Sequence, residues 1–175
     1  MDFETRTNEI MSLDDNIETK ADRIITMISK SKKEYKVKEK YAFVSKTIKS
    51  MIEACPNGDT FPLITIEDDV IELIVEYMNY QKGRDCEFPR KPLRSKNLKE
   101  SMTDINKVWL VDWINKVDDN GNGRIKLYNL INACNFLNIQ GLLHLACAKV
   151  ASFVVEEPLE NIPKIFGNYE EEKKE

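Results

Sequence analysis

The segment from Leu127 to Phe166 constrains the fold more than any other part of the chain. It predicts two consecutive helices that meet at residues 138–141, and the second helix, from Gly141 to Val155, is unusually apolar. Successive residues of an α-helix turn by about 100°, so the apolar side chains of this helix form two neighbouring stripes that span roughly 140°. A surface helix with one buried face needs a stripe of only about 100°. The apolar surface of this helix is therefore wider than burial against a single core requires.

The two stripes of the second helix are distinct sets of residues. The first consists of Leu142, Ala146 and Phe153, and the second of Leu143, Cys147 and Val154, with Val150 between the two sets. The pattern allows two interpretations. Either the helix is buried on two sides within its own fold, or one stripe faces the core and the other faces a protein partner. Leu145 falls outside the apolar arc, and His144 falls opposite it, so we expect His144 to be exposed to solvent.

Composition excludes several classes of function. The chain has 175 residues and a formal net charge of −4, and its basic residues are interspersed with acidic ones, so we expect no binding to nucleic acid. No segment approaches the roughly 20 apolar residues of a membrane-spanning helix, and the N-terminus does not resemble a signal peptide. The four cysteines show no CxxC spacing and the chain has one histidine, so a zinc site is not expected. These features predict a cytoplasmic and nuclear protein with no membrane contact, no metal and no cofactor.

The order of the expected elements predicts an α+β fold. Residues 1–22 are rich in acids and are expected to form a flexible extension. Residues 23–29 and the alternation around Tyr35 and Val37 predict a β-hairpin. A third strand is expected within Phe61–Ile66. A helix with one buried face is predicted for a set of apolar residues at helical spacing: Val44, Ile48, Met51 and Ile52.

The middle of the chain continues this pattern. A helix from about Glu67 to Gln81 is expected to begin with a capping box formed by Thr65 and Asp68. The apolar residues that it should bury are Val70, Ile71, Ile74, Val75 and Met78. Residues 82–103 form a polar loop with a modest basic excess; such a loop could contact phosphates, but a solvated, flexible connector is the favoured interpretation. A further helical pattern runs from Val108 to Val117.

The segment Asp118–Asn129 is similar to a calcium-binding loop but departs from it at a decisive position. Asn129 stands where calcium needs a bidentate carboxylate, and Asp118 is the only charged side chain among the usual ligand positions. We interpret the segment as a glycine- and asparagine-rich turn. That the protein responds to calcium is kept as a less favoured hypothesis. No cluster of catalytic groups occurs in the chain, so we expect that the protein is not an enzyme.

The element order, together with several short runs, resembles the Skp family of ubiquitin-ligase adaptors, which have a BTB/POZ-type α+β core followed by C-terminal helices. The most specific run is Ala133–Leu143, and the resemblance extends over some 145 residues. The supporting runs are Ser45–Ile52, Phe61–Leu63 and Val108–Trp109. The related elongin-C group ends near the equivalent of Ile139, whereas this chain continues, so it is more similar to the Skp branch.

The resemblance implies four segments: a flexible acidic extension over 1–22, a BTB/POZ-like core over 23–139, a C-terminal helical F-box-binding segment over 140–167, and a charged tail over 168–175. It also implies a non-enzymatic adaptor that links a cullin scaffold to an F-box substrate receptor. Asn135 and Phe136 match the family's cullin-contacting pair. The positions that match the F-box contacts are Tyr128, Leu143, Cys147, Val150 and Val154, and the helical pattern had already placed four of these five in or beside the second stripe.

The chain also departs from the family. The loop before Val108 is usually acidic in the family and is mildly basic here, and family members usually continue into further short helices with a Trp that wrap the F-box, so we expect weaker F-box binding. The alternative hypothesis is a BTB-like interaction scaffold or decoy that binds only one of the two partners. An apolar stripe without its partner also predicts a possible homodimer.

Overall fold

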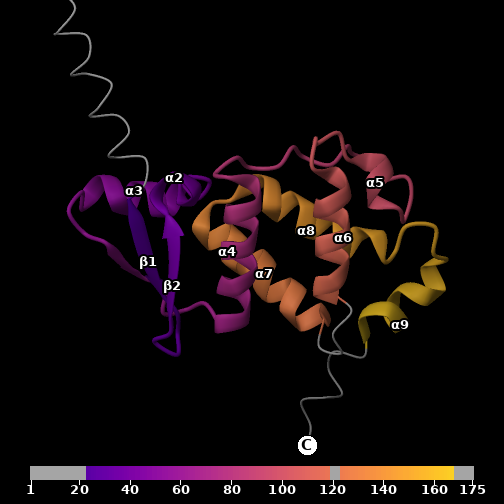
Figure 1. The fold of residues 1–175 in the computed structure, drawn as a ribbon. Coiled ribbons are helices and arrows are strands. Elements are labelled where there is room, and N and C mark those ends of the chain that lie inside the picture. The colour runs from indigo at the N-terminus through magenta and orange to yellow at the C-terminus, as the bar shows by residue number, and fades with distance from the viewer. Residues whose placement is uncertain (1–22, 119–122, 168–175) are drawn as a thin grey trace, which may run out of the picture. The chain divides into compact units, whose positions relative to one another are not determined.

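The computed structural model describes residues 23–118 and 123–167 (Figure 1). The predicted extension over 1–22, the tail over 168–175 and residues 119–122 of the calcium-loop-like segment lie outside the described residues. The chain divides into two compact units, Met1–Arg84 with Phe136–Asn138, and Asp85–Asn135 with Ile139–Glu175. The α+β class is confirmed.

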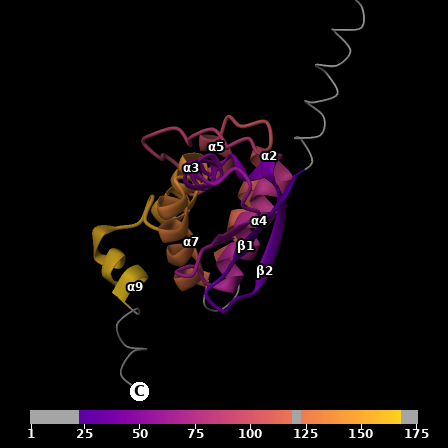
Figure 2. The same cartoon turned by 90° about the vertical axis from the view of Figure 1, so that its left-hand side faces the viewer.

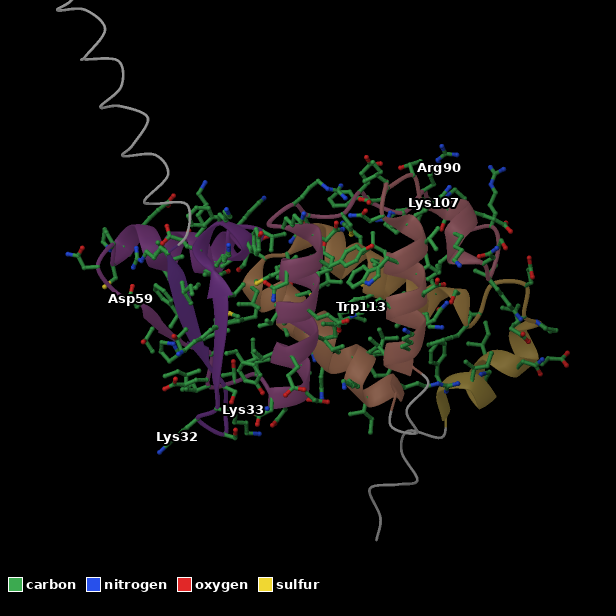
Figure 3. The ribbon with its side chains drawn as sticks, viewed as in Figure 1. Lys32, Lys33, Asp59, Arg90, Lys107 and Trp113 are labelled. Atoms are coloured by element: carbon green, nitrogen blue, oxygen red, sulfur yellow. The ribbon has the colours of Figure 1, made fainter. Side chains whose placement is uncertain are left out.

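The first unit contains a small mixed sheet. Strands β1 (Ile24–Ile28) and β2 (Glu34–Lys38) form the predicted antiparallel hairpin, and β3 (Thr60–Pro62) pairs parallel to β1, giving the order β2-β1-β3. The third strand is shorter than expected. After Leu63 donates its backbone N–H to the carbonyl of Ile28 at 2.7 Å, the chain turns, and Ile66 N donates to Leu63 O at 3.0 Å. Lys32 and Lys33 lie at the tip of the hairpin (Figure 3).

Residues 23–84 of the first unit also contain the helices α2 (Glu39–Ala42), α3 (Lys46–Ala54) and α4 (Asp68–Gln81). Alternation along β1 buries Ile25 and Met27, and α4 lies against the sheet, where it contacts β2 (Figures 1 and 2). Four of the five predicted core residues of α4 are buried, but Val75 is only half-buried. Tyr77 takes the additional core position, because the buried face of this helix is wider than one stripe.

The predicted capping box at the start of α4 is wrong. Glu67 is the N-cap residue, and its side chain makes no capping hydrogen bond. The carboxylate of Asp68 instead accepts the hydroxyl of Ser31, at 2.7 Å, from the hairpin turn. Hydrogen bonds from Ser29 and Ser31 hold the pKa of Asp68 below its usual value. The carboxylate that was expected to cap the helix is therefore bound by a residue distant in sequence.

The second unit is helical. It contains α5 (Leu98–Ser101), α6 (Lys107–Asp118), most of α7 (Gly123–Leu137), α8 (Gln140–Ser152), the 3₁₀ turn η1 (Leu159–Asn161) and α9 (Ile162–Gly167). Helix α6 contacts α5 and α8, and on α6 the rings of Trp109 and Trp113 stack with centroids 5.6 Å apart (Figure 3 labels Trp113). The expectation of a wholly solvated loop over 82–103 is wrong, because Cys86, Leu98 and Met102 are buried.

Candidate protein-binding surfaces

The end of α7 is defined by backbone geometry. The helix ends at Leu137, Asn138 adopts a left-handed conformation with φ of 52°, and Ile139 N donates to Cys134 O at 3.0 Å. Asparagine adopts this conformation more readily than most residues because its short polar side chain can hydrogen-bond locally, and the hydrogen bond from Ile139 is that of a Schellman motif. The predicted junction between two helices at residues 138–141 is therefore confirmed.

Two hydroxyl groups hold the last turn of α7 within the first unit. Ser45 Oγ donates to Leu137 O at 2.6 Å, and Thr47 Oγ1 donates to Phe136 O at 2.8 Å. Ser45 is buried and is also the N-cap of α3, where its hydroxyl accepts the N–H of Ile48. The final carbonyls of a helix have no partner within the helix, so these two side chains satisfy them from another element.

The pair that resembles a cullin contact lies on this turn. Asn135 is exposed, and the side chain of Phe136 is 49% exposed although its backbone carbonyl is bound by Thr47. An exposed aromatic ring on a fixed backbone loses little conformational freedom when a partner covers it. The geometry thus suits both residues to a protein contact.

The start of α8 is held by a residue that the sequence pattern did not indicate. Ile139, the N-cap residue, makes no side-chain cap, and the carboxylate of Asp85 accepts the N–H groups of Gly141 at 2.6 Å and Leu142 at 3.3 Å. A β-carbon on Gly141 would lie 2.2 Å from Cys86 O, so only glycine permits this close approach. In the sequence, only the glycine at position 141 indicates that another part of the chain approaches the start of this helix closely.

Helix α8 separates buried from accessible apolar residues. Leu142, Leu145 and Ala146 are completely buried. The prediction that Leu145 lies outside the apolar face is wrong, because both α5 and α6 contact α8 and bury a wider face than one stripe. The second stripe is accessible: Leu143 and Val150 are half-buried, and Cys147 is exposed. Their spacing of four and three residues places all three on one side of the helix.

The helix ends at Ser152, earlier than the predicted Val155, because residues 153–156 form a turn that leads to Glu156 at a φ of 67°. Val154, the last member of the predicted F-box set, lies in this turn and is half-buried. It therefore follows the helical stripe rather than continuing it.

The turn after α8 carries a second cluster that the sequence did not indicate. Cations of Arg124 and Lys149 lie 5.4 and 5.0 Å from the ring centroid of Phe153. Tyr128, the remaining member of the predicted F-box set, is half-buried and lies one turn after Arg124 on the same side of α7. A cavity of about 580 Å³ opens at this turn, and its lining includes Arg124, Lys149 and Phe153. The surface beyond α8 thus combines an aromatic ring with positive charge.

His144 is not fully exposed, contrary to expectation. Its ring is half-buried and meets the ring of Phe88 edge-on, with centroids 4.4 Å apart, and its Nδ1 lies 3.5 Å from Lys91 Nζ. The loop that the sequence suggested was solvated covers this side of α8. This contact explains why helical periodicity alone misplaced the residue.

The cysteines and the described acidic groups form no metal site. Cys86 and Cys134 are buried, Cys55 and Cys147 are exposed, and none of these four described cysteines is part of a disulfide. Within residues 23–118 and 123–167, no group of three or more His, Cys, Asp or Glu side chains could hold a metal ion. Over the same residues, no helix combines the length and apolar character needed to cross a bilayer.

The sequence matches other known proteins over most of its length. Residues 23–83 match the family model described as Skp1 family, tetramerisation domain. The chain is 30% identical over 143 residues to the S-phase kinase-associated protein 1 homolog of Tetrahymena thermophila, an alignment that covers 82% of this chain and 81% of that protein. It is also 30% identical over 151 residues to SKP1-like protein 1 of Oryza sativa subsp. japonica, covering 83% of each. SKP1-like protein 11 of Arabidopsis thaliana is 28% identical over 145 residues, covering 83% of this chain and 84% of that protein.

The matched family segment coincides with the sheet and helices of the first unit, and the longer alignments extend well beyond it. The chain belongs to the Skp1 family, whose members are non-enzymatic adaptors of ubiquitin-ligase complexes.

Proposed function

We propose that this chain links a cullin N-terminal domain to an F-box substrate receptor in an SCF-type ubiquitin ligase. Family membership supports the role of a ubiquitin-ligase adaptor. The main support for the link to an F-box receptor is the accessible side of α8. Leu143, Cys147 and Val150 remain accessible there although Leu142 and Ala146 are fully buried. An apolar row that its own fold does not cover is suited to a helical partner, whose apolar face would lie in it.

The F-box surface consists of Leu143, Cys147, Val150, Val154 and Tyr128. Its first three members are aligned on α8, and Val154 lies in the turn that follows. The cullin surface consists of Asn135 and Phe136, at the end of α7. The adaptor itself carries out no chemistry in this proposal. It raises the effective concentration of a bound substrate near the catalytic subunits, in the cytoplasm and nucleus.

The F-box surface is tested by replacing Leu143 and Val150 together with Asp. Each change would place a charge in an apolar interface, and we expect F-box affinity to fall by roughly a hundredfold or more, since central apolar contacts contribute about 1–3 kcal/mol each. Cullin affinity should stay within about twofold of the unmodified chain, because those contacts lie elsewhere. Ile64→Asp, at a 67% exposed apolar residue of the first unit, is the matched control and should leave F-box binding unchanged.

The cullin surface is tested with a variant that should lose cullin binding and keep F-box binding. Replacing Asn135 and Phe136 with Lys should abolish binding to a cullin N-terminal fragment and spare the F-box peptide. Affinities can be measured by titration calorimetry with the purified full chain. If neither double variant changes either affinity, the linking role is wrong; binding to one partner only would favour the scaffold or decoy hypothesis.

A further inference from the structure

The loop between α4 and α6 carries a cluster of cations on a fixed backbone. Its basic residues between positions 90 and 99 are Arg90, Lys91, Arg94, Lys96 and Lys99. Arg90 N donates to Ser101 O at 2.8 Å, and the adjacent Leu98 and Met102 are buried. The backbone of the loop is therefore anchored here, and its order costs less entropy on binding than that of a free linker.

A cavity of about 340 Å³ opens on this loop. Its lining includes Arg90, Lys91, Arg94, Asn97 and Glu100, all within the second unit. Arg90 lies at the outer surface of the loop, beside α5 (Figure 3). The volume lies at the lower end of the range of about 300–1,000 Å³ that is usual for small-molecule sites, so the cavity can admit a compact group.

The cations of this loop differ in their partners. Lys96 pairs with Glu157, and Lys99 pairs with Asp112 at 2.8 Å; neither lysine lines the cavity. Among the residues that the structure describes, no carboxylate lies within ion-pair distance of Arg90 or Arg94, both of which line it. The two arginines that line the cavity are thus cations of this loop that no described carboxylate neutralises.

The remaining charged groups of the lining determine the net charge of the cavity. Lys91 Nζ lies 3.5 Å from the ring nitrogen of His144, which brings no negative charge, and Glu100 accepts a hydrogen bond from Asn97 Nδ2 at 3.1 Å. Three cations and one carboxylate leave a net charge of two positive units in the lining. A phosphomonoester carries about −1.5 to −2 charges at pH 7, and the planar guanidinium group matches its oxygen atoms in paired hydrogen bonds.

We propose that this cavity binds a phosphomonoester group, with Arg90 and Arg94 as its principal ligands and Lys91 as a third. A single carboxylate would neutralise only half of the charge, and an apolar ligand none of it. None of the residues that line the cavity belongs to the proposed cullin or F-box surface, so this proposal does not rest on the adaptor function. The group could be carried by a phosphorylated side chain or by a small phosphate ester.

The test measures binding of a fluorescent peptide with one phosphoserine to the purified full chain, by anisotropy in about 0.15 M salt, where long-range attraction is screened. The same peptide with unmodified serine is the reference. Arg90→Gln with Arg94→Gln is compared with Lys96→Gln with Lys99→Gln, which removes equal charge from the same loop but from paired lysines outside the cavity. Thermal melts of all variants verify that folding is retained.

We expect the arginine pair to lower phosphopeptide affinity by about tenfold or more, since charge-assisted hydrogen bonds from guanidinium groups to phosphate are among the stronger ones. The lysine pair should change the affinity by less than about twofold. Glucose 6-phosphate and inorganic phosphate are added as competitors; competition equal to that of the unlabelled peptide assigns the site to free phosphate esters, and weaker competition assigns it to a phosphorylated chain. Equal binding of both peptides, or equal losses in both double variants, would overturn the proposal.

Discussion

Replacing Ser45 with Ala would remove two hydrogen bonds with one atom. Ser45 Oγ accepts the N–H of Ile48 at 3.1 Å as the N-cap of α3, and it donates to Leu137 O at 2.6 Å. Loss of an N-cap costs about 1 kcal/mol, and leaving a buried carbonyl without a partner costs about 1–3 kcal/mol. Because Ser45 is completely buried, water does not replace the lost hydroxyl. We therefore expect the free energy of unfolding to fall by roughly 2–4 kcal/mol.

Urea denaturation followed by circular dichroism measures this loss. With a slope of about 2 kcal/mol per molar urea, the middle of the usual range, the midpoint should fall by about 1–2 M. Thr47→Val is the matched control: it removes the 2.8 Å hydrogen bond to Phe136 O, but that site is exposed and water can take the place of the hydroxyl, so we expect a loss below about 1 kcal/mol. Equal losses in the two variants, or a loss below about 1 kcal/mol for Ser45→Ala, would refute the dual role of Ser45.

Three further outcomes are expected. An F-box peptide should protect Cys147 from alkylation in the native protein and leave the other exposed thiol, Cys55, unprotected; mass spectrometry after brief labelling distinguishes the two, and equal protection would argue against the assigned surface. Although Cys147 is accessible, partial burial of its thiol raises the pKa above the ordinary value of 9.0. Since the thiolate is the reactive form, the labelling rate in the free protein should still rise steeply above pH 9, and a plateau by pH 9 would contradict this. Gly141→Ala would place a β-carbon 2.2 Å from Cys86 O and 2.6 Å from Asp85 Oδ1, so we expect a loss of about 2 kcal/mol or more in urea denaturation, and a neutral effect would show that the start of α8 can shift freely.

Local periodicity predicted the parts of the fold whose partners are close in sequence. Alternation at Tyr35 and Val37 gave the second strand, and Ile48 and Ile52 gave the buried side of α3. These signals are reliable because strands and helices repeat with fixed periods, and a residue's face follows from its position. The run Ala133–Leu143 likewise located the helix junction at which the candidate cullin surface lies.

Features that depend on distant partners could not be predicted in this way. Asp85 binds the start of α8 from 56 residues away, and the carboxylate of Asp68 is bound by Ser31, 37 residues away, instead of capping its own helix. The burial of Leu145 depends on the contacts of α5 and α6 with α8, and that of one side of His144 depends on Phe88 in a loop without a periodic pattern. A helical wheel reports which residues share a face, but it does not report how many neighbouring elements the fold brings to that helix.

The two outer strands of the sheet limit how copies of this protein can associate. On one edge, β2 carries the charged residues Glu34, Lys36 and Lys38 between its buried positions. On the other edge, β3 is only three residues long and ends in Pro62, which has no backbone N–H to donate. Charged side chains, short strands and proline all discourage the addition of a strand from another molecule. At high concentration the chain should thus resist growth of intermolecular sheets, and self-association is left to its helical surfaces.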